Sequence, residues 1–75
     1  MDLYGERELT KKEFMIVTLL HQGLMNKEIA ALVGTTENVV KNYLRVIFDK
    51  LGFHNRVEVA LWFEEKFWEK ENEVS

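Results

Sequence analysis

Residues 26–52 read NKEIAALVGTTENVVKNYLRVIFDKLG, and the later half of this stretch has the pattern of an amphipathic helix. Its apolar positions recur at steps of four, three and four residues, which is the spacing of a stripe that faces a core. These positions are Val40, Leu44, Ile47 and Leu51. Beside the stripe lies a short polar and basic group formed by Lys41, Asn42 and Arg45. The pattern alone leaves open whether this group is a solvated helix face or a binding face.

The residues before this helix have the features of a helix-turn-helix joint. Ala30 is small, as a second helix crossing at close range requires, and Gly34 can adopt a backbone conformation that a Cβ would strain. Apolar residues that can hold the two helices at a steep angle are Ile29, Val33 and Val40. We therefore predict a helix-turn-helix unit whose joint is formed by Ala30, Gly34 and Val40.

A helix-turn-helix gives the polar group a chemical meaning. In such a unit the second helix lies in the DNA major groove, with its N-terminal half at the base edges. Arginine and lysine can donate to guanine O6 and N7, and asparagine can pair with adenine N6 and N7. Because the apolar stripe faces inward, Lys41, Asn42 and Arg45 face outward, and we predict that they contact the bases of double-stranded DNA.

The remaining capping and glycine signals predict a compact all-α fold of four helices. Thr10 followed by Glu13 has the pattern of a capping box, which marks the start of the first helix. Gly23, Gly34 and Gly52 are placed to end the first three helices. The predicted N-caps of the later helices are Asn26, Thr36 and Asn55. The predicted organisation is a leader at 1–9, a domain at 10–70 whose last helix runs over 56–70, and a frayed tail at 71–75.

Composition argues against several classes of function. The 75-residue chain has no cysteine, so it contains no disulfide, no thiol nucleophile and no cysteine-based zinc site. His21 and His54 lie far apart without a cluster of further ligands, and we expect no metal and no other cofactor. No apolar run approaches the roughly 20 residues of a membrane span and no signal peptide opens the chain, so we expect a cytoplasmic protein. Without a catalytic motif or an evident small-molecule ligand, we predict that the protein is not an enzyme.

The net charge of −3 taken alone argues against a nucleic-acid partner, but the charges are unevenly distributed. Residues 10–56 carry seven lysines or arginines against four acidic residues. Residues 57–75 carry six glutamates against two lysines, and residues 1–9 are also acidic. The local field near the predicted helix-turn-helix is therefore positive, and the total charge is a poor guide to it.

Four motifs together resemble the LuxR-type helix-turn-helix domain, which is also known from the spore regulator GerE. They are LTKKE at the start of the first helix, NKEIA in the second, VVKNYL in the third, and KLG followed by HNR and a glutamate. The resemblance runs without gaps from Leu9 to about Phe63. It implies a four-helix DNA-binding domain of transcription regulators, whose third helix enters the major groove and whose last helix usually forms a dimer.

Carried over by position, Lys41, Asn42 and Arg45 resemble the base-facing residues of the family. The residues that resemble its phosphate contacts are Thr36, Asn38, Lys50, Asn55 and Arg56. The chain also departs from the family pattern. Val39 stands where the family usually has threonine, Tyr43 where it often has histidine, and Val46 where polar residues are usual. Because Val39 lacks the hydroxyl of that threonine, one phosphate contact of the family would be lost.

The predicted fourth helix is apolar around most of its circumference, whereas packing on one small core needs only a stripe. We expect the inward stripe to consist of Val57, Ala60 and Leu61. The apolar residues left over are Val59, Trp62, Phe63 and Phe67, and we predict that they form a homodimer interface. In the alternative, the end of this helix folds back under the N-terminal segment around Leu3 and Tyr4.

Two functions follow from these observations. The first is a DNA-binding transcription regulator that acts as a homodimer on two half-sites about one helical turn apart. The second is a protein-interaction module of the same fold, which binds another regulator or a polymerase through its fourth helix. The sequence also leaves open whether the chain is a free-standing regulator or the end of a longer one, and the initial Met1 favours the former.

Overall fold

Five helical elements follow one another in the computed structural model, which describes residues 9–68. They are α1 (Lys11–His21), α2 (Asn26–Val33), α3 (Glu37–Leu51), α4 (Arg56–Phe63) and the π-helical turn η2 (Glu64–Trp68). No β-strand occurs within residues 9–68, and the predicted all-α class is confirmed. The predicted leader up to residue 8, the tail at 71–75 and the alternative contact with Leu3 and Tyr4 lie outside the described residues.

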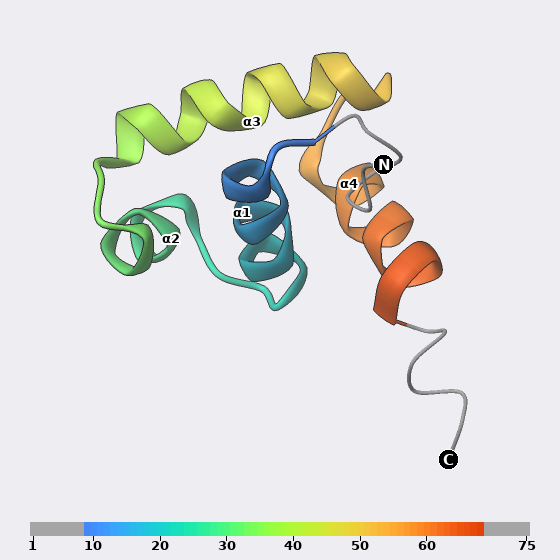
Figure 1. Ribbon diagram of the computed structural model, residues 1–75, viewed down its shortest axis with the longest axis horizontal. Helices are drawn as coiled ribbons and strands as arrows, with labels where there is room; N and C mark the ends of the chain where they lie inside the picture. The colour runs from blue at the N-terminus through green and yellow to red at the C-terminus, as the bar shows by residue number, and fades with distance from the viewer. Residues whose placement is uncertain (1–8, 69–75) are drawn as a thin grey trace.

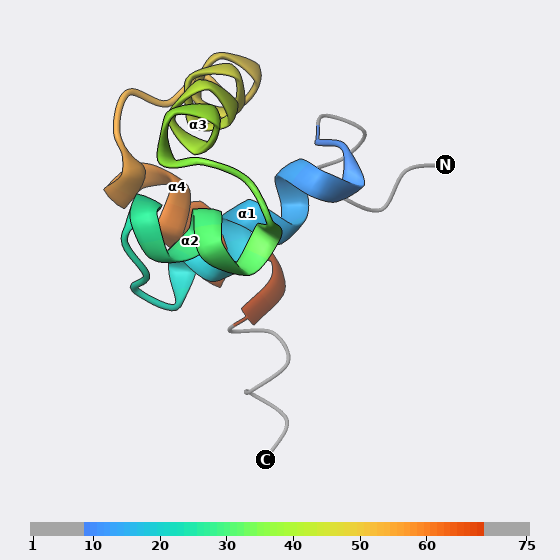
Figure 2. The ribbon, with the colours of Figure 1, turned by 90° about the vertical axis from the view of Figure 1, so that its left-hand side faces the viewer.

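The longest helix, α3, forms one outer side of the molecule. It runs across α1 and α2, and α4 lies beyond them towards its C-terminal end (Figure 1). A view turned by 90° shows α3 nearly end-on, again above α1 and α2 (Figure 2). The inner side of α3 therefore meets the rest of the domain, whereas none of the described elements covers its outer side in either view.

One hydrophobic core joins all four α-helices. Its fully buried side chains come from α1 (Ile16, Val17), α2 (Ile29), α3 (Val40, Ile47) and α4 (Val59). Each helix contributes apolar residues to the same cluster, so the four helices bury their apolar faces against one another. The core thus fixes the orientation of α3 and, with it, the face that α3 turns outward.

Local capping explains where most helices begin and end. The predicted capping box is present: Glu13 N–H donates to Thr10 Oγ1 at 3.1 Å, and Thr10 N–H donates to Glu13 Oε1 at 2.9 Å. Asn55 Oδ1 accepts from Glu58 N–H at 3.0 Å, which confirms the predicted cap of α4. Gly52 follows α3 with a φ of 76°, a left-handed conformation that favours glycine.

The predicted N-cap of α2 is wrong by one residue. The helix begins at Asn26, and Met25 is its N-cap. Methionine has no side-chain oxygen with which to cap, so the Glu28 carboxylate alone closes this turn, accepting from Met25 N–H at 2.7 Å. The Asn26 amide is instead used outside the helix, where it contacts Arg56.

The last helix also differs from the single helix predicted over 56–70. Its α-helical part ends at Phe63, and the chain continues as the π-helical turn Glu64–Trp68. A π turn is wider than an α turn and therefore rotates the side chains that follow it. Here it accompanies the packing of Phe67 against Phe14, with ring centroids 5.1 Å apart, and against Phe63, at 5.3 Å. Each aromatic pair of this kind contributes about 0.5–1.5 kcal/mol beyond the area it buries.

Candidate nucleic-acid interface

The outer face of α3 carries the polar and basic group that the sequence singled out. Val40, Leu44 and Ile47 are buried on the inner face of the helix. Since successive residues are about 100° apart around a helix, this anchoring turns the other face to solvent. The exposed residues of that face include Asn38, Lys41, Asn42 and Arg45. All of them lie in the first nine residues of α3, the half that begins at the helix-turn-helix joint.

Lys41 and Arg45, the two cations of this face, have no anionic partner among residues 9–68. Among the described residues, neither Lys41 nor Arg45 forms an ion pair, although acidic residues stand four positions away on either side. Glu37 precedes Lys41 at the start of α3, and Asp49 follows Arg45 near its end. The charges of Lys41 and Arg45 are therefore not used in an ion pair within residues 9–68, and they remain available to a ligand.

The predicted joint between α2 and α3 is present. Ala30 is buried, and its carbonyl accepts from the N–H groups of both Gly34 and Thr35 at 2.9 Å. Gly34 has a φ of 85°, so it is needed for its backbone conformation and not for space, since a Cβ there would meet no atom within 4 Å. The turn brings α3 across α2, and Thr36 then caps α3 by accepting from Val39 N–H at 3.3 Å.

Thr36 and Asn55, two of the predicted phosphate contacts, cap helices as hydrogen-bond acceptors. Capping in this way does not use the hydrogens that their side chains can donate. Thr36 Oγ1 and Asn55 Oδ1 accept backbone N–H groups, as described above. A hydroxyl that accepts in this way can still donate its own hydrogen, and an asparagine keeps its NH₂ group. Both residues are exposed. Their capping function and a phosphate contact are therefore compatible.

Lys50 is exposed, but its ammonium is tied to a buried carboxylate of the domain. Its Nζ lies 2.7 Å from Glu13 Oε1, and the Glu13 side chain is only 6% exposed. The same carboxylate oxygen closes the capping box of α1, so one buried group joins the start of α1 to the end of α3. Release of Lys50 towards a phosphate would leave this carboxylate without its cation, which is costly for a buried charge. Lys50 thus positions α3.

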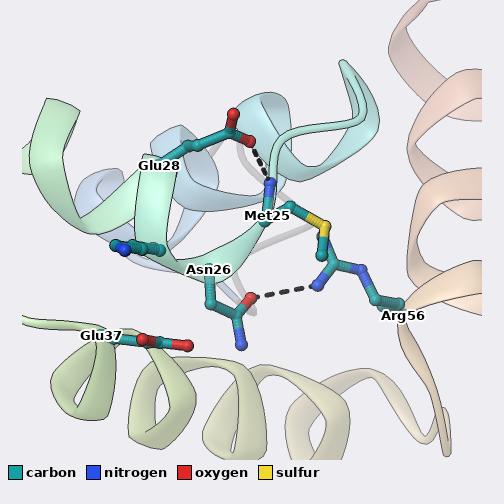
Figure 3. A pocket seen from close by; sticks show the side chains of 6 residues that line it. Met25, Asn26, Glu28, Glu37 and Arg56 are labelled. Carbon is teal, nitrogen blue, oxygen red and sulfur yellow. Dashed lines mark hydrogen bonds between the residues drawn. The ribbon is translucent and has the colours of Figure 1, made fainter.

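Arg56 is held in a similar way (Figure 3). It donates to Leu24 O at 2.7 Å and to Asn26 Oδ1 at 3.1 Å, and thereby ties the start of α4 to the start of α2. The guanidinium borders a surface hollow whose other lining residues are Met25, Asn26, Lys27, Glu28 and Glu37. Two cations and two carboxylates line this hollow, so it has no formal net charge with which to favour an anion.

Two valines on the exposed side of α3 were not among the predicted base contacts. Val39 is 37% exposed and Val46 is 44% exposed. Both were visible in the sequence as departures from the family pattern, and the apolar stripe already placed them outside the core, but they were not chosen as base contacts because they carry no polar group. They lie beside Asn42, on the flank of the exposed side away from Lys41.

The structure reverses the predicted faces of α4 except at Ala60, which packs against the core as expected. Val59 and Phe63, which we placed in a dimer interface, are core residues with 0% and 4% exposure. Val57 and Leu61, which we expected to face inward, are each 63% exposed. Every face of α4 is strongly apolar, so any of them could have packed inward. The contacts with α1 determine that Val59 and Phe63 are the residues that become buried. Phe63, for instance, packs against the rings of Phe14 and His21.

The other two residues of the predicted interface are half-buried in an aromatic cluster. Trp62 lies between Phe53 and Phe67, with ring centroids 6.4 Å and 5.6 Å away. These contacts stabilise the end of the domain and leave little of either Trp62 or Phe67 for a second chain. The exposed apolar stripe of α4 therefore consists of Val57 and Leu61.

Within the described residues, no group of three or more histidine, cysteine, aspartate or glutamate side chains could hold a metal ion. None of the helices in this part of the chain has both the length and the hydrophobicity to cross a membrane.

The arrangement described so far defines a helix-turn-helix domain with an exposed, positively charged second helix. A family model for bacterial regulatory proteins of the luxR family, GerE, matches residues 7–63. This chain belongs to that family, as the resemblance of its motifs implied.

Several curated relatives agree with this assignment. The transcriptional regulatory protein DesR of Bacillus subtilis is 37% identical over 70 residues, 92% of this chain and 35% of DesR. The nitrate/nitrite response regulator protein NarL of Escherichia coli K12 is 37% identical over 59 residues, 79% of this chain and 27% of NarL. The DNA-binding transcriptional activator DevR/DosR of Mycobacterium tuberculosis is 39% identical over 57 residues, 76% of this chain and 26% of DevR/DosR.

The chain spans only about a quarter to a third of the length of these relatives. No solved structure matches it.

Proposed function

We propose that this domain binds double-stranded DNA and regulates transcription, with α3 in the major groove. The observation that carries the proposal is the exposure of Lys41, Asn42 and Arg45 on the first half of α3, opposite the buried Val40 and Ile47. Lysine and arginine are suited to guanine O6 and N7, and asparagine to adenine N6 and N7. Membership of the luxR family supports the same function, since relatives such as DevR/DosR are described as DNA-binding.

Phosphate contacts would surround the base contacts. Asn38 is exposed one turn before Asn42, and Thr36 and Asn55 retain free donors. These three residues are our candidates. Lys50 and Arg56 are withdrawn from the proposal, because each already has a short polar contact inside the domain. Removal of either should weaken DNA binding only through the placement of α3 or α2.

A second copy of the chain would pack on α4. The exposed stripe of Val57 and Leu61 is an apolar surface, and residues four apart on a helix lie next to each other. In a symmetric dimer the same stripe meets its own copy, so that two α3 helices are presented to half-sites about one helical turn apart. This stripe replaces the interface predicted from the sequence.

The same stripe supports the alternative function. Val57 and Leu61 are as available to another regulator or a polymerase as to a second copy. In that alternative, Lys41 and Arg45 contribute only to a solvated face and the domain has no affinity for DNA.

Fluorescence anisotropy on a labelled random-sequence duplex distinguishes the two functions. If the proposal holds, the domain binds with a Kd of about 10⁻⁴–10⁻⁶ M at physiological salt, and log K falls linearly with log salt concentration. Such binding is expected even without an operator, because it comes from contacts with phosphates. Absence of binding at 20–50 mM salt, roughly the range in which phosphate contacts are strongest, would refute the DNA-binding proposal and leave the protein-interaction module.

A further inference from the structure

The outer side of α3 carries an apolar ridge next to its basic group. Val39 and Val46, which we call the valine ridge, are 37% and 44% exposed. They are seven residues apart, which is close to two helical turns, so that one lies almost directly above the other. Asn42 lies between them along the helix, and it is exposed as well. The face proposed to meet the bases is therefore part polar and part apolar.

The core does not account for this ridge. The inner face of α3 is already supplied by Val40, Leu44 and Ile47, each at most 5% exposed. A valine is also a poorer helix former than lysine, glutamate or glutamine, which a solvated helix face would favour. Two β-branched apolar residues on this face thus lower helix propensity without adding to the core. Their exposure alone needs no explanation, but they lie beside the exposed Asn42, on the side of α3 where the proposed DNA contact forms.

We propose that Val39 and Val46 contact the C5-methyl groups of thymines in the major groove, and that they select thymine at two positions of each half-site. The proposal rests on the DNA-binding function and adds a specificity determinant to it. The thymine methyl is the one apolar group that base edges present in the major groove, and apolar side chains recognise it there. Because the valines are about 10 Å apart along the helix axis, one methyl cannot serve both.

The neighbouring charges favour DNA over a protein as the occupant of the ridge. Lys41 and Arg45 stand on the same exposed side and, in the described part of the chain, have no acidic partner. Since successive residues are about 100° apart, these cations lie roughly 100–160° around α3 from the valines, on its other flank. A single occupant must therefore contact an apolar flank and a basic flank of the same helix, and the major groove, which admits an α-helix, encloses both. DNA meets both requirements at once, since its phosphates and guanines accept from the cations while thymine methyls meet the valines.

The test removes the thymine methyl from the DNA in one arm and substitutes the valine in the protein in the other. An operator is first selected from a randomised duplex library with the unchanged protein. Each thymine of the selected half-site is then replaced by deoxyuridine, which removes the methyl and keeps every hydrogen-bonding group of the base edge. We expect two replacements per half-site to weaken binding about fourfold each, the effect of one methyl-sized group withdrawn from an apolar contact.

The protein arm assigns each thymine to a valine. In Val39→Ser one uracil effect should fall below about twofold, and in Val46→Ser the other should do so. Serine removes both methyl groups of valine, whereas threonine would keep one that can itself contact a thymine methyl. Met15→Gln is the matched control. Met15 is also 44% exposed but lies on α1, on the side away from Glu13 and α3, so both uracil effects should persist.

The outcomes separate this inference from the function on which it rests. If no sequence is enriched and no salt-dependent binding occurs, the DNA-binding function itself is wrong. If an operator is bound but uracil is tolerated at every thymine, the valine ridge does not recognise methyl groups. The same conclusion follows if both uracil effects survive unchanged in Val39→Ser and Val46→Ser, since other residues would then contact the methyls.

Discussion

The double variant Lys41→Glu/Arg45→Glu should bind DNA at least about 100-fold more weakly than the unchanged domain. Each of the two side chains is expected to contribute about 1–3 kcal/mol to the bound state, and the new carboxylates would in addition repel phosphates. On a random-sequence duplex, where the two cations contact phosphates instead of specific bases, the slope of log K against log salt concentration should also fall by about two, one for each cation removed. Fluorescence anisotropy across a salt series measures both quantities on the same samples.

The control for this variant reverses the same amount of charge elsewhere. Lys11 and Lys66 are exposed on α1 and η2, which are not part of the proposed interface. Lys11→Glu/Lys66→Glu should reduce affinity only slightly, through the long-range field. An equal loss in the two double variants would mean that overall charge, and not the face of α3, determines binding.

Folding must be checked because α3 already contains acidic residues near the substituted positions. Glu37 precedes Lys41 by four residues and Asp49 follows Arg45 by four. The new carboxylates create like-charge pairs at this spacing, each costing about 0.2–0.5 kcal/mol. The neutral variant Lys41→Gln/Arg45→Gln avoids these pairs. It should show an intermediate loss of affinity with nearly unchanged thermal stability by circular dichroism.

The second large effect is expected from Leu61→Glu, which should convert a dimer into a monomer. Leu61 is 63% exposed and belongs, with Val57, to the apolar stripe of α4. In a symmetric dimer this substitution places two carboxylates in an apolar contact, one from each copy. Loss of a central apolar side chain from an interface already costs about 2 kcal/mol or more, and the two like charges add to that cost. We expect the dimer dissociation constant to rise at least about 100-fold, and analytical ultracentrifugation measures it.

Leu32→Glu is the matched control for this prediction. Leu32 is 65% exposed, almost the same as Leu61, but lies on α2. The variant adds the same charge to an equally exposed leucine, and it should dimerise like the unchanged protein. If Leu61→Glu left the association state unchanged, the stripe would be a site for a different protein or for none.

Local signals in the sequence were sufficient for the helix-turn-helix. The joint at Ala30 and Gly34 and the cap at Thr36 are each determined by residues within a few positions of one another. The face of α3 followed from a single apolar stripe, because the outer residues Lys41 and Arg45 are polar. A helix with one apolar side leaves only one way to pack.

The α4 helix could not be oriented in the same way. With Val57, Val59, Leu61 and Phe63 all apolar, periodicity gives several inward faces of similar quality. The choice is made by tertiary contacts, such as the ring of Phe14 against Phe63. The internal contacts of Lys50 and Arg56 were equally invisible, because their partners Glu13, Leu24 and Asn26 are 30 or more residues away in the chain.

Methylation interference on the selected operator shows directly whether α3 contacts base edges in the major groove. Dimethyl sulfate modifies guanine N7, which lies in the major groove, and adenine N3, which lies in the minor groove. We predict that N7 methylation of guanines within each half-site prevents binding, and that this interference weakens in the Lys41→Gln/Arg45→Gln variant. Interference confined to adenine N3, or absent at every guanine of a bound operator, would contradict the account.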